Sequence, residues 1–272
     1  NPYPGFVIGA HGAELVDADG RNLIDFCFNA TSMPLGHSDP RVVEAVTRQV
    51  DGGGTSLQTM TGREIDLAAE VCNRISAADQ IRFTNSGSEA VMLAIRLARG
   101  FTGRDIVLKF EGSYHGTYDD VQWSVSAPPD RTGPSGLPAV VPEAAGLTEN
   151  YGRTVVLPYN DAETLSRWMA ESGEQVASVL VEPMASRIGL VIPDLAFLEA
   201  ARRACDSSGA VLIFDEVIAF RLGFGGAQSV VGVDPDITVL GKSIGGGFPV
   251  GGVAGRTEIM EITLPGRTRR VT

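Results

Sequence analysis

Short apolar runs alternate with amphipathic segments along most of the chain. From residue 80 onward, five runs of strand length each lead into polar residues: QIRFTN, DIVLKF, VASVLVEP, AVLIFDE and DITVLG, beginning at residues 80, 105, 176, 210 and 236. Such runs alternating with helices are typical of an α/β fold, in which a mostly parallel sheet carries helices on both faces. We therefore expect an α/β architecture of this kind.

The beginning of the chain follows a different pattern. Alternating apolar and polar positions over residues 13–28 flank Asp19 and Gly20, a dipeptide that readily adopts the positive φ of a tight turn. This pattern predicts a β-hairpin. Helical spacing of apolar positions then predicts one helix within residues 39–50, capped by its first residue, and a second helix over residues 63–75.

Composition places the chain among soluble globular proteins. It has 272 residues, of which 43% are hydrophobic and 20% are charged. We expect residues 1–50 to form an N-terminal hairpin and helix segment and residues 51–272 to form the large α/β domain. The three cysteines lie far apart without a CxxC pair, which favours reduced core residues in a cytoplasmic protein.

Charge narrows the choice of partners. The formal net charge of -11 argues against nucleic acid and anionic membrane, since both repel an acidic surface. No apolar run approaches the roughly 20 residues needed to cross a bilayer, and no basic leader is present. A small-molecule ligand is the better expectation.

Lysine is rare and its placement is informative. Lys and Arg together number 22, yet lysine occurs only at positions 109 and 242. Lys242 stands between an apolar run and a cluster of glycines. An arginine stays protonated, whereas a lysine can lose its proton and attack a carbonyl carbon. We interpret Lys242 as a catalytic amine and Lys109, which lies inside a predicted strand, as structural.

Polar residues follow the predicted strands at the edge where an open α/β sheet binds ligands. The Ser86-Gly87-Ser88 turn opens a predicted helix, where free N–H groups and the helix dipole suit a phosphate; an ordinary helix cap is the alternative. Asp215 ends an apolar run and needs a cationic or hydrogen-bonding partner, at a ligand or in a structural ion pair. With Lys242, these residues predict one shared site.

The chain resembles the class III, fold-type-I pyridoxal-phosphate aminotransferases, and most closely the branch that contains glutamate-1-semialdehyde 2,1-aminomutase. The motifs cover nearly the whole chain in order, and their combination is specific to this family. They are VDADGRNLIDF, LGHSDPRVVEAV, RFTNSGSEAVMLAIRLARGFTGRD, KFEGSYHG, FDEVIAFRL and PDITVLGKSIGGGFPVGGVAG. The resemblance implies the large domain of a fold-type-I enzyme, with pyridoxal 5'-phosphate as its cofactor.

The resemblance also implies a role for each matching residue at the ring of the cofactor. Lys242 would carry the Schiff base, and Asp215 would pair with the pyridine nitrogen and keep it charged. Tyr114 would stack on one face of the ring and Val217 would lie against the other. Lys242, once displaced by a substrate amine, would move the proton between substrate and cofactor carbons.

Further residues are implied at the phosphate and at the rim of the pocket. Ser86, Gly87 and Ser88 would hold the phosphate, and Glu182 with Glu216 would support the pocket around the ring. His115, beside the stacking tyrosine, is either a site residue that contacts substrate or a satisfied core histidine. The other two histidines have no ligand spacing with it, so we expect no metal.

The chain departs from the aminomutase pattern in three places. Arg187 stands in EPMASRIG where aminomutases usually have asparagine, and it is a candidate for binding a substrate carboxylate, with a surface arginine as the alternative. The run DEVIAFR is one residue shorter than usual. The chain also ends before the Gly-Thr segment that the family places in a partner's phosphate site, and before its small C-terminal domain. The resemblance implies a homodimer with a shared active site.

We expect an aminotransferase that moves an amino group between an amino acid or amine and a keto acid or aldehyde. The first alternative is the aminomutase, which returns the nitrogen to a neighbouring carbon of the same molecule. The second is a non-catalytic scaffold that keeps the fold. Fold analogy does not identify the substrate.

Overall fold

The computed structural model describes residues 5–55, 57, 59–134, 138–149, 153–264 and 271. Within the described part, no helix combines the length and the apolar character that crossing a lipid bilayer requires.

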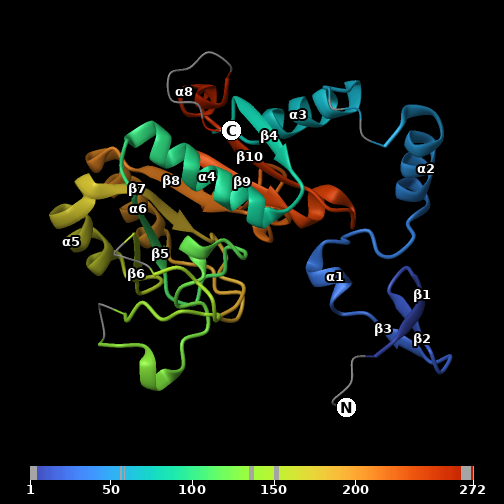
Figure 1. Ribbon diagram of the computed structural model, residues 1–272, viewed down its shortest axis with the longest axis horizontal. Helices are drawn as coiled ribbons and strands as arrows, with labels where there is room; N and C mark the ends of the chain where they lie inside the picture. Colours follow the sequence, from blue (N-terminus) through green and yellow to red (C-terminus); the bar gives the residue numbers. More distant parts are fainter. Residues whose placement is uncertain are drawn as a thin grey trace.

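A seven-stranded sheet forms the centre of the molecule (Figure 1). The order of its strands is β4-β10-β9-β8-β7-β5-β6, and only β10 runs antiparallel to its neighbours. The strands are β4 (Gln80–Thr84), β5 (Ile106–Phe110), β6 (Thr154–Leu157), β7 (Val176–Val181), β8 (Val211–Asp215), β9 (Ile237–Gly241) and β10 (Gly251–Gly255). The predicted α/β fold with a mostly parallel sheet is confirmed.

The five predicted runs became β4, β5, β7, β8 and β9, whereas β6 and β10 were not predicted. In β10, the sequence GGVAG has too many glycines to be recognised as a strand. The structure gives a reason for the first of them: a Cβ at Gly251 would lie 2.2 Å from the carbonyl oxygen of Ser86. The strand therefore runs against the start of the helix that follows β4.

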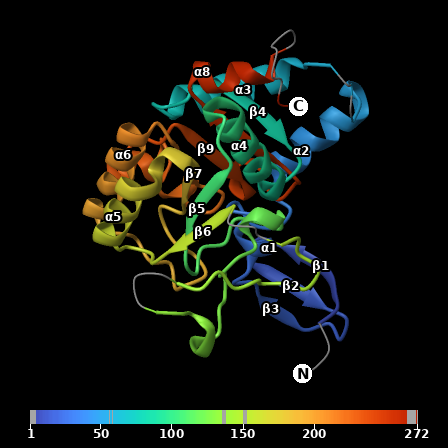
Figure 2. The same ribbon diagram turned by 60° about the vertical axis from the view of Figure 1, so that its left-hand side comes forward.

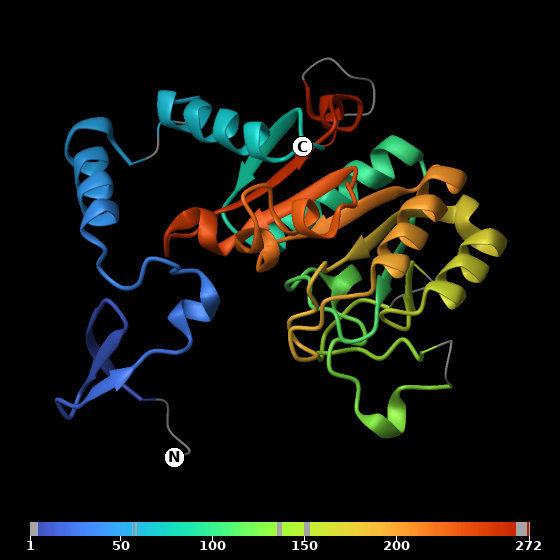
Figure 3. The same ribbon diagram turned by 180° about the vertical axis from the view of Figure 1, so that it is seen from behind.

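Helices cover both faces of the sheet, as Figures 1 and 3 show from opposite sides. On one face, α4 (Gly87–Thr102) packs Ile95 and its neighbours against alternate residues of β7 to β10. On the other face, α5 (Ala162–Ser172) and α6 (Leu195–Ser208) cover β5, β7 and β8. Each large apolar side chain buried in these layers contributes about 1.5–3 kcal/mol. Two apolar layers therefore hold the strand ends in fixed relative positions.

The N-terminal segment forms a separate antiparallel sheet of β1 (Val7–His11), β2 (Glu14–Asp17) and β3 (Asn22–Ile24), beside α1 (Figure 2). The hairpin turn predicted at Asp19-Gly20 is present, with a φ of 78° at Gly20. The predicted helices are also present: α2 (Pro40–Arg48) is capped by Asp39, and α3 (Gly62–Arg74) follows. The proposed division after residue 50 stays a prediction.

Shorter helices connect these elements. They are α1 (Phe28–Thr31), α7 (Ala227–Val231), α8 (Thr257–Met260), the π-helix η1 (Gln49–Gly53) and the 3₁₀ helices η2 (Asp119–Val121), η3 (Pro129–Arg131), η4 (Gly173–Gln175), η5 (Ala219–Leu222), η6 (Lys242–Gly245) and η7 (Glu261–Thr263).

The cysteines differ from the expectation. All three are free, but only Cys205 is buried, whereas Cys72 is half-buried and Cys27 is exposed. Cys27 is exposed because the strand ends before it and the chain turns into α1.

Candidate active site

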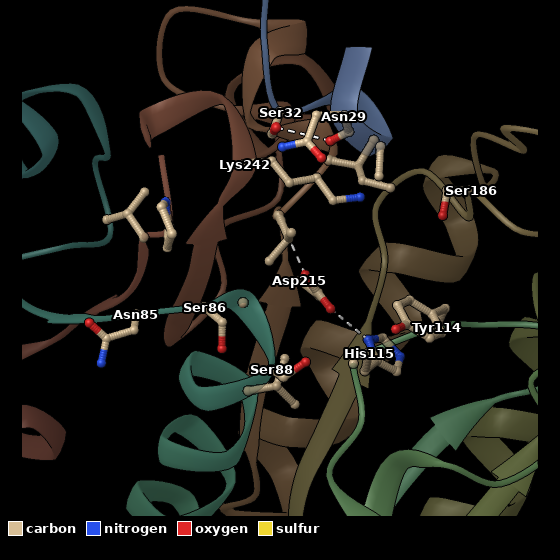
Figure 4. A pocket seen from close by; sticks show the side chains of 18 of the residues that line it. Asn29, Ser32, Asn85, Ser86, Ser88, Tyr114, His115, Ser186, Asp215 and Lys242 are labelled. Carbon is tan, nitrogen blue, oxygen red and sulfur yellow. Dashed lines mark hydrogen bonds and ion pairs between the residues drawn. The ribbon is translucent and has the colours of Figure 1, made fainter. Parts of the chain in front are cut away.

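A cavity of about 560 Å³ lies at the ends of β4, β5, β7, β8 and β9, where the chain leaves the sheet. Figure 4 shows side chains from these ends directed into the same space. Ten predicted site residues line it: Ser86, Gly87, Ser88, Tyr114, His115, Glu182, Arg187, Asp215, Val217 and Lys242. The packing that fixes the sheet thus brings residues from five separate parts of the chain to one place.

The first turn of α4 forms one end of the cavity. Ser86 is its N-cap, and the Ser86 hydroxyl oxygen accepts a hydrogen bond of 3.1 Å from the N–H of Glu89. The Glu89 carboxylate in turn accepts from the N–H of Asn85, the residue before the N-cap, at 2.6 Å. The helix start therefore presents N–H groups without intrahelical partners and the positive end of the dipole to the cavity. Both features attract an anion such as a phosphate.

Asp215, the last residue of β8, is 5% exposed at the floor of the cavity. Its Oδ2 lies 2.9 Å from Nδ1 of His115, and its Oδ1 accepts a bond of 3.1 Å from the N–H of Val217. Both oxygens are thus oriented by neighbours, as a buried carboxylate requires. His115 is buried and lines the cavity, but its Nε2 has no hydrogen-bond partner among the described residues, so it is not a satisfied core histidine. Its contact with substrate stays a prediction.

Lys242 begins η6 directly after β9 and has a φ of 46°. A positive φ is unfavourable for a residue with a side chain, and such strain gathers at functional sites. Burial lowers the pKa of the Lys242 amine, and the guanidinium groups of Arg221 and Arg187 act in the same direction. The carboxylates of Asp215 and Glu182 partly oppose this shift of the pKa. A lowered pKa makes the uncharged, nucleophilic form of the amine more accessible near neutral pH.

Tyr114, Glu182 and Arg187 form the wall between β5 and β7. The backbone N–H of Tyr114 donates to Oε2 of Glu182 at 2.9 Å, and the hydroxyl of Ser186 donates to Oε1 at 3.1 Å. Burial raises the pKa of Glu182, although these two bonds and His115 favour its ionised form. The guanidinium carbon of Arg187 lies 4.6 Å from the centre of the Tyr114 ring, in a cation–π contact.

One implied residue lies elsewhere. Glu216 is fully buried, but its carboxylate is directed away from the cavity and caps α7. It accepts bonds of 2.6 and 3.0 Å from the N–H groups of Ala227 and Gln228. The expectation that Glu216 supports the pocket around a ring is therefore not met, because adjacent residues after a strand project to opposite sides.

The structure also adds residues that the sequence did not indicate. Asn29 and Ser32, around α1, line the cavity from the N-terminal segment, and Phe248 with Val250 lines it from the loop before β10. Phe248 and Val250 lie within the last family motif, but nothing in it assigned them to the site. Asn29 and Ser32 lie outside every motif, since only the return of the N-terminal segment to the strand ends places them there. The signal for Ser186 was its position four residues after Glu182, on the same loop.

Comparison with known proteins assigns the family. Residues 2–269 match the family model described as Aminotransferase class-III. The chain belongs to the class-III aminotransferase family. The predicted resemblance is confirmed, and it extends to the aminomutase branch. This class-III chain is 46% identical over 266 residues to a protein of Caldivirga maquilingensis named glutamate-1-semialdehyde 2,1-aminomutase, covering 97% of this chain and 60% of that protein.

Solved structures agree with this assignment. An omega-transaminase from Sphaerobacter thermophilus has a TM-score of 0.95 and 42% identity, over 100% of this class-III chain and 62% of that protein. A structure described as a transaminase with PLP bound has a TM-score of 0.90 and 39% identity, over 99% and 62% of the two chains. The class-III chain thus spans about three fifths of the length of the proteins that it matches.

Proposed function

We propose that this chain holds pyridoxal 5'-phosphate and forms the large domain of an enzyme that transfers an amino group. One observation carries the proposal: Lys242, with its lowered pKa, and the buried carboxylate of Asp215 line the same cavity. The start of α4 supplies N–H donors for the phosphate at the end of that cavity. The amine, the carboxylate and the anion site together fit this cofactor.

When bound, pyridoxal phosphate supplies an aldehyde that condenses with amines and a ring that draws electrons from the carbon bearing the amine. Asp215, held by His115 and Val217, would keep a proton on the ring nitrogen. Tyr114 and Val217 would exclude water from the ring faces. Lys242 would form the covalent link and, when released, would take and return a proton as a general base.

The names of the curated relatives favour transfer within one molecule. They support the aminomutase, which was the first alternative of the sequence analysis, better than the transaminase that it placed first. In an aminomutase the same residues would return the amino group to a neighbouring carbon without a second substrate. Lys242 would then serve as the base at both carbons.

A second candidate, a transaminase acting on two substrates, is favoured by Arg187. This guanidinium lies at the cavity on the Tyr114 ring, in the place where aminomutases usually have asparagine, and it forms no ion pair with another described residue. Its free edges suit the carboxylate of an amino acid or keto acid. The two solved structures above, both transaminases, add support to this candidate.

One experiment separates the candidates in full-length protein loaded with pyridoxal phosphate. An aminomutase converts glutamate-1-semialdehyde to its isomer without any second substrate. A transaminase releases a keto acid from an amino donor only in proportion to the acceptor supplied. Under the second candidate, Arg187→Met should raise KM for acidic donors by about 10–100-fold while donors without a carboxylate change little. A cofactor absorbance band unchanged by every donor and by the semialdehyde would instead indicate a non-catalytic scaffold.

We also propose that the enzyme acts as a homodimer. Large apolar side chains of the N-terminal segment are left exposed, including Phe6 at 72% and Phe26 at 92%. Exposed apolar groups in such numbers favour a protein interface. Light scattering of full-length protein should give twice the mass of one chain, and Phe26→Asp should shift the mass toward that of the monomer.

A further inference from the structure

Lys109, the second lysine of the chain, is fully buried in β5 and does not line the cavity. A buried ammonium group loses its hydration, so the position requires compensating partners. Burial lowers the pKa of Lys109 to about 7, against the opposing charges of Glu182 and Glu143. The strands of this sheet bury mostly apolar side chains, so a fully buried lysine among them needs a specific explanation.

The amine of Lys109 holds the loop that follows its own strand. Its Nζ donates a bond of 2.9 Å to the carbonyl oxygen of Ser113 and one of 2.5 Å to the carbonyl oxygen of Trp123. The first acceptor belongs to the peptide unit that joins Ser113 to Tyr114. The N–H of this same peptide unit donates to Glu182 at 2.9 Å.

A single peptide unit is therefore held from both sides, by a lysine at its oxygen and by a glutamate at its N–H. Both partners match the polarity of the peptide, since the amine donates to the carbonyl oxygen and the carboxylate accepts from the N–H. We call this arrangement of Lys109, the Ser113–Tyr114 peptide and Glu182 the peptide clamp. Rotation of the peptide would break both bonds and leave Lys109 and Glu182 partly unpaired in the interior.

The peptide clamp acts on the next two side chains of the loop. The orientation of the peptide sets the direction in which Tyr114 enters the cavity beside Arg187. The next residue, His115, forms a hydrogen bond through its Nδ1 with Asp215. A buried group outside the cavity thus determines how two groups inside it are presented.

We propose that Lys109 is a positioning residue of the site, which through the peptide clamp fixes Tyr114 for cofactor binding and His115 for its bond to Asp215. The cofactor part of this inference rests on the proposed function, whereas the part about His115 does not. A purely structural lysine would affect stability alone. Loss of a positioning lysine would therefore change cofactor binding and the His115–Asp215 bond, whereas loss of a purely structural lysine would change neither.

The test compares Lys109→Met with Leu108→Ala in full-length protein. Methionine matches the length of lysine without its N–H donors. Leu108 is the adjacent buried residue of β5 on the opposite face, so its truncation lowers stability without touching the peptide clamp. Two quantities are measured in the apo-protein: the Kd for pyridoxal phosphate, by absorbance titration, and the NMR signal of the His115 ring, assigned through its loss in His115→Gln.

We expect Lys109→Met to weaken pyridoxal phosphate binding by about tenfold, the effect of losing a hydrogen bond that orders the site, and to move the His115 signal. Leu108→Ala should lower Tm, leave Kd within about twofold and leave the His115 signal in place. If Lys109→Met does not fold, Lys109→Gln replaces it, since its shorter amide keeps two donors and should give smaller changes of the same kind.

A Kd and a His115 signal both unchanged in the lysine variant would overturn the inference. Equal changes in Leu108→Ala would overturn it too, because the effect would then follow stability. If wild-type protein does not bind pyridoxal phosphate, the proposed function fails, and the His115 signal alone decides whether Lys109 positions the loop.

Discussion

His115 and Asp215 are joined by a hydrogen bond of 2.9 Å between Nδ1 and Oδ2, and both side chains are almost completely buried. The histidine comes from the loop after β5 and the aspartate from the end of β8, two strands that are separated in the sheet by β7. The bond therefore ties two strand ends together at the floor of the cavity. It leaves the carboxylate with a single orientation.

Removing this bond should impair the site without unfolding the protein. We expect His115→Gln to lower the rate of amino transfer by about 10–100-fold, the effect of one lost hydrogen bond to a charged group. His37→Gln is the matched control, because His37 makes a similar bond of 2.7 Å to Asp25 outside the cavity. The measurement is the steady-state rate of each variant at one temperature below the Tm of both. Equal losses of rate in the two variants would contradict the prediction.

Lys242 should be the lysine that reacts with the cofactor. After incubation with pyridoxal phosphate and borohydride, peptide mapping is expected to find the label at Lys242 and none at Lys109, which is fully buried. Lys242→Ala should lose the label and reduce the turnover number by about a thousandfold or more. A label retained in that variant would assign the covalent link to another group.

Gly116 is expected to tolerate no side chain. It has a φ of 90°, and a Cβ would lie 2.8 Å from the Cα of Ser88, in the turn proposed to hold phosphate. Gly116→Ala should therefore lower the free energy of unfolding by more than about 1–2 kcal/mol, which is the cost of the left-handed conformation alone. It should also weaken pyridoxal phosphate binding. Gly20→Ala, at a φ of 78° with open space around it, controls for the conformation. Urea unfolding and cofactor titration compare the two variants, and equal results would contradict the prediction.

The buried amine of Lys109 should make stability depend on pH. Its pKa falls from 10.5 to about 7 on folding, so between these values the unfolded chain binds the additional proton. The free energy of unfolding of the wild type should then rise, relative to Lys109→Met, as the pH increases from about 7 toward 10. Below pH 7 both states hold the proton, and the difference between the proteins should stay constant. Urea titrations at pH 6 to 10 measure this difference, and a flat profile would show that the pKa is not lowered.

Much of the site was predictable because a parallel sheet collects its carboxyl ends at one edge. Asp215 ends one predicted strand and Lys242 follows another, so a mostly parallel sheet brings the two to the same edge, where they line one cavity. Glu216 shows the limit of this reasoning. Alternation along the strand indicates that Glu216 projects away from Asp215, but its acceptance of N–H bonds from α7 depends on how the chain returns after the strand.

The sequence by itself determined the α/β class, the motifs of the family and the residue types that suit a pyridoxal phosphate site, because periodicity and the order of polar residues after apolar runs are local properties. Tertiary structure decided which groups meet across the chain. The glycine-rich strand β10, the entry of Asn29 into the cavity and the peptide held between Lys109 and Glu182 all depend on segments far apart in sequence. Their geometry is set by close packing of the whole core, which no local pattern encodes.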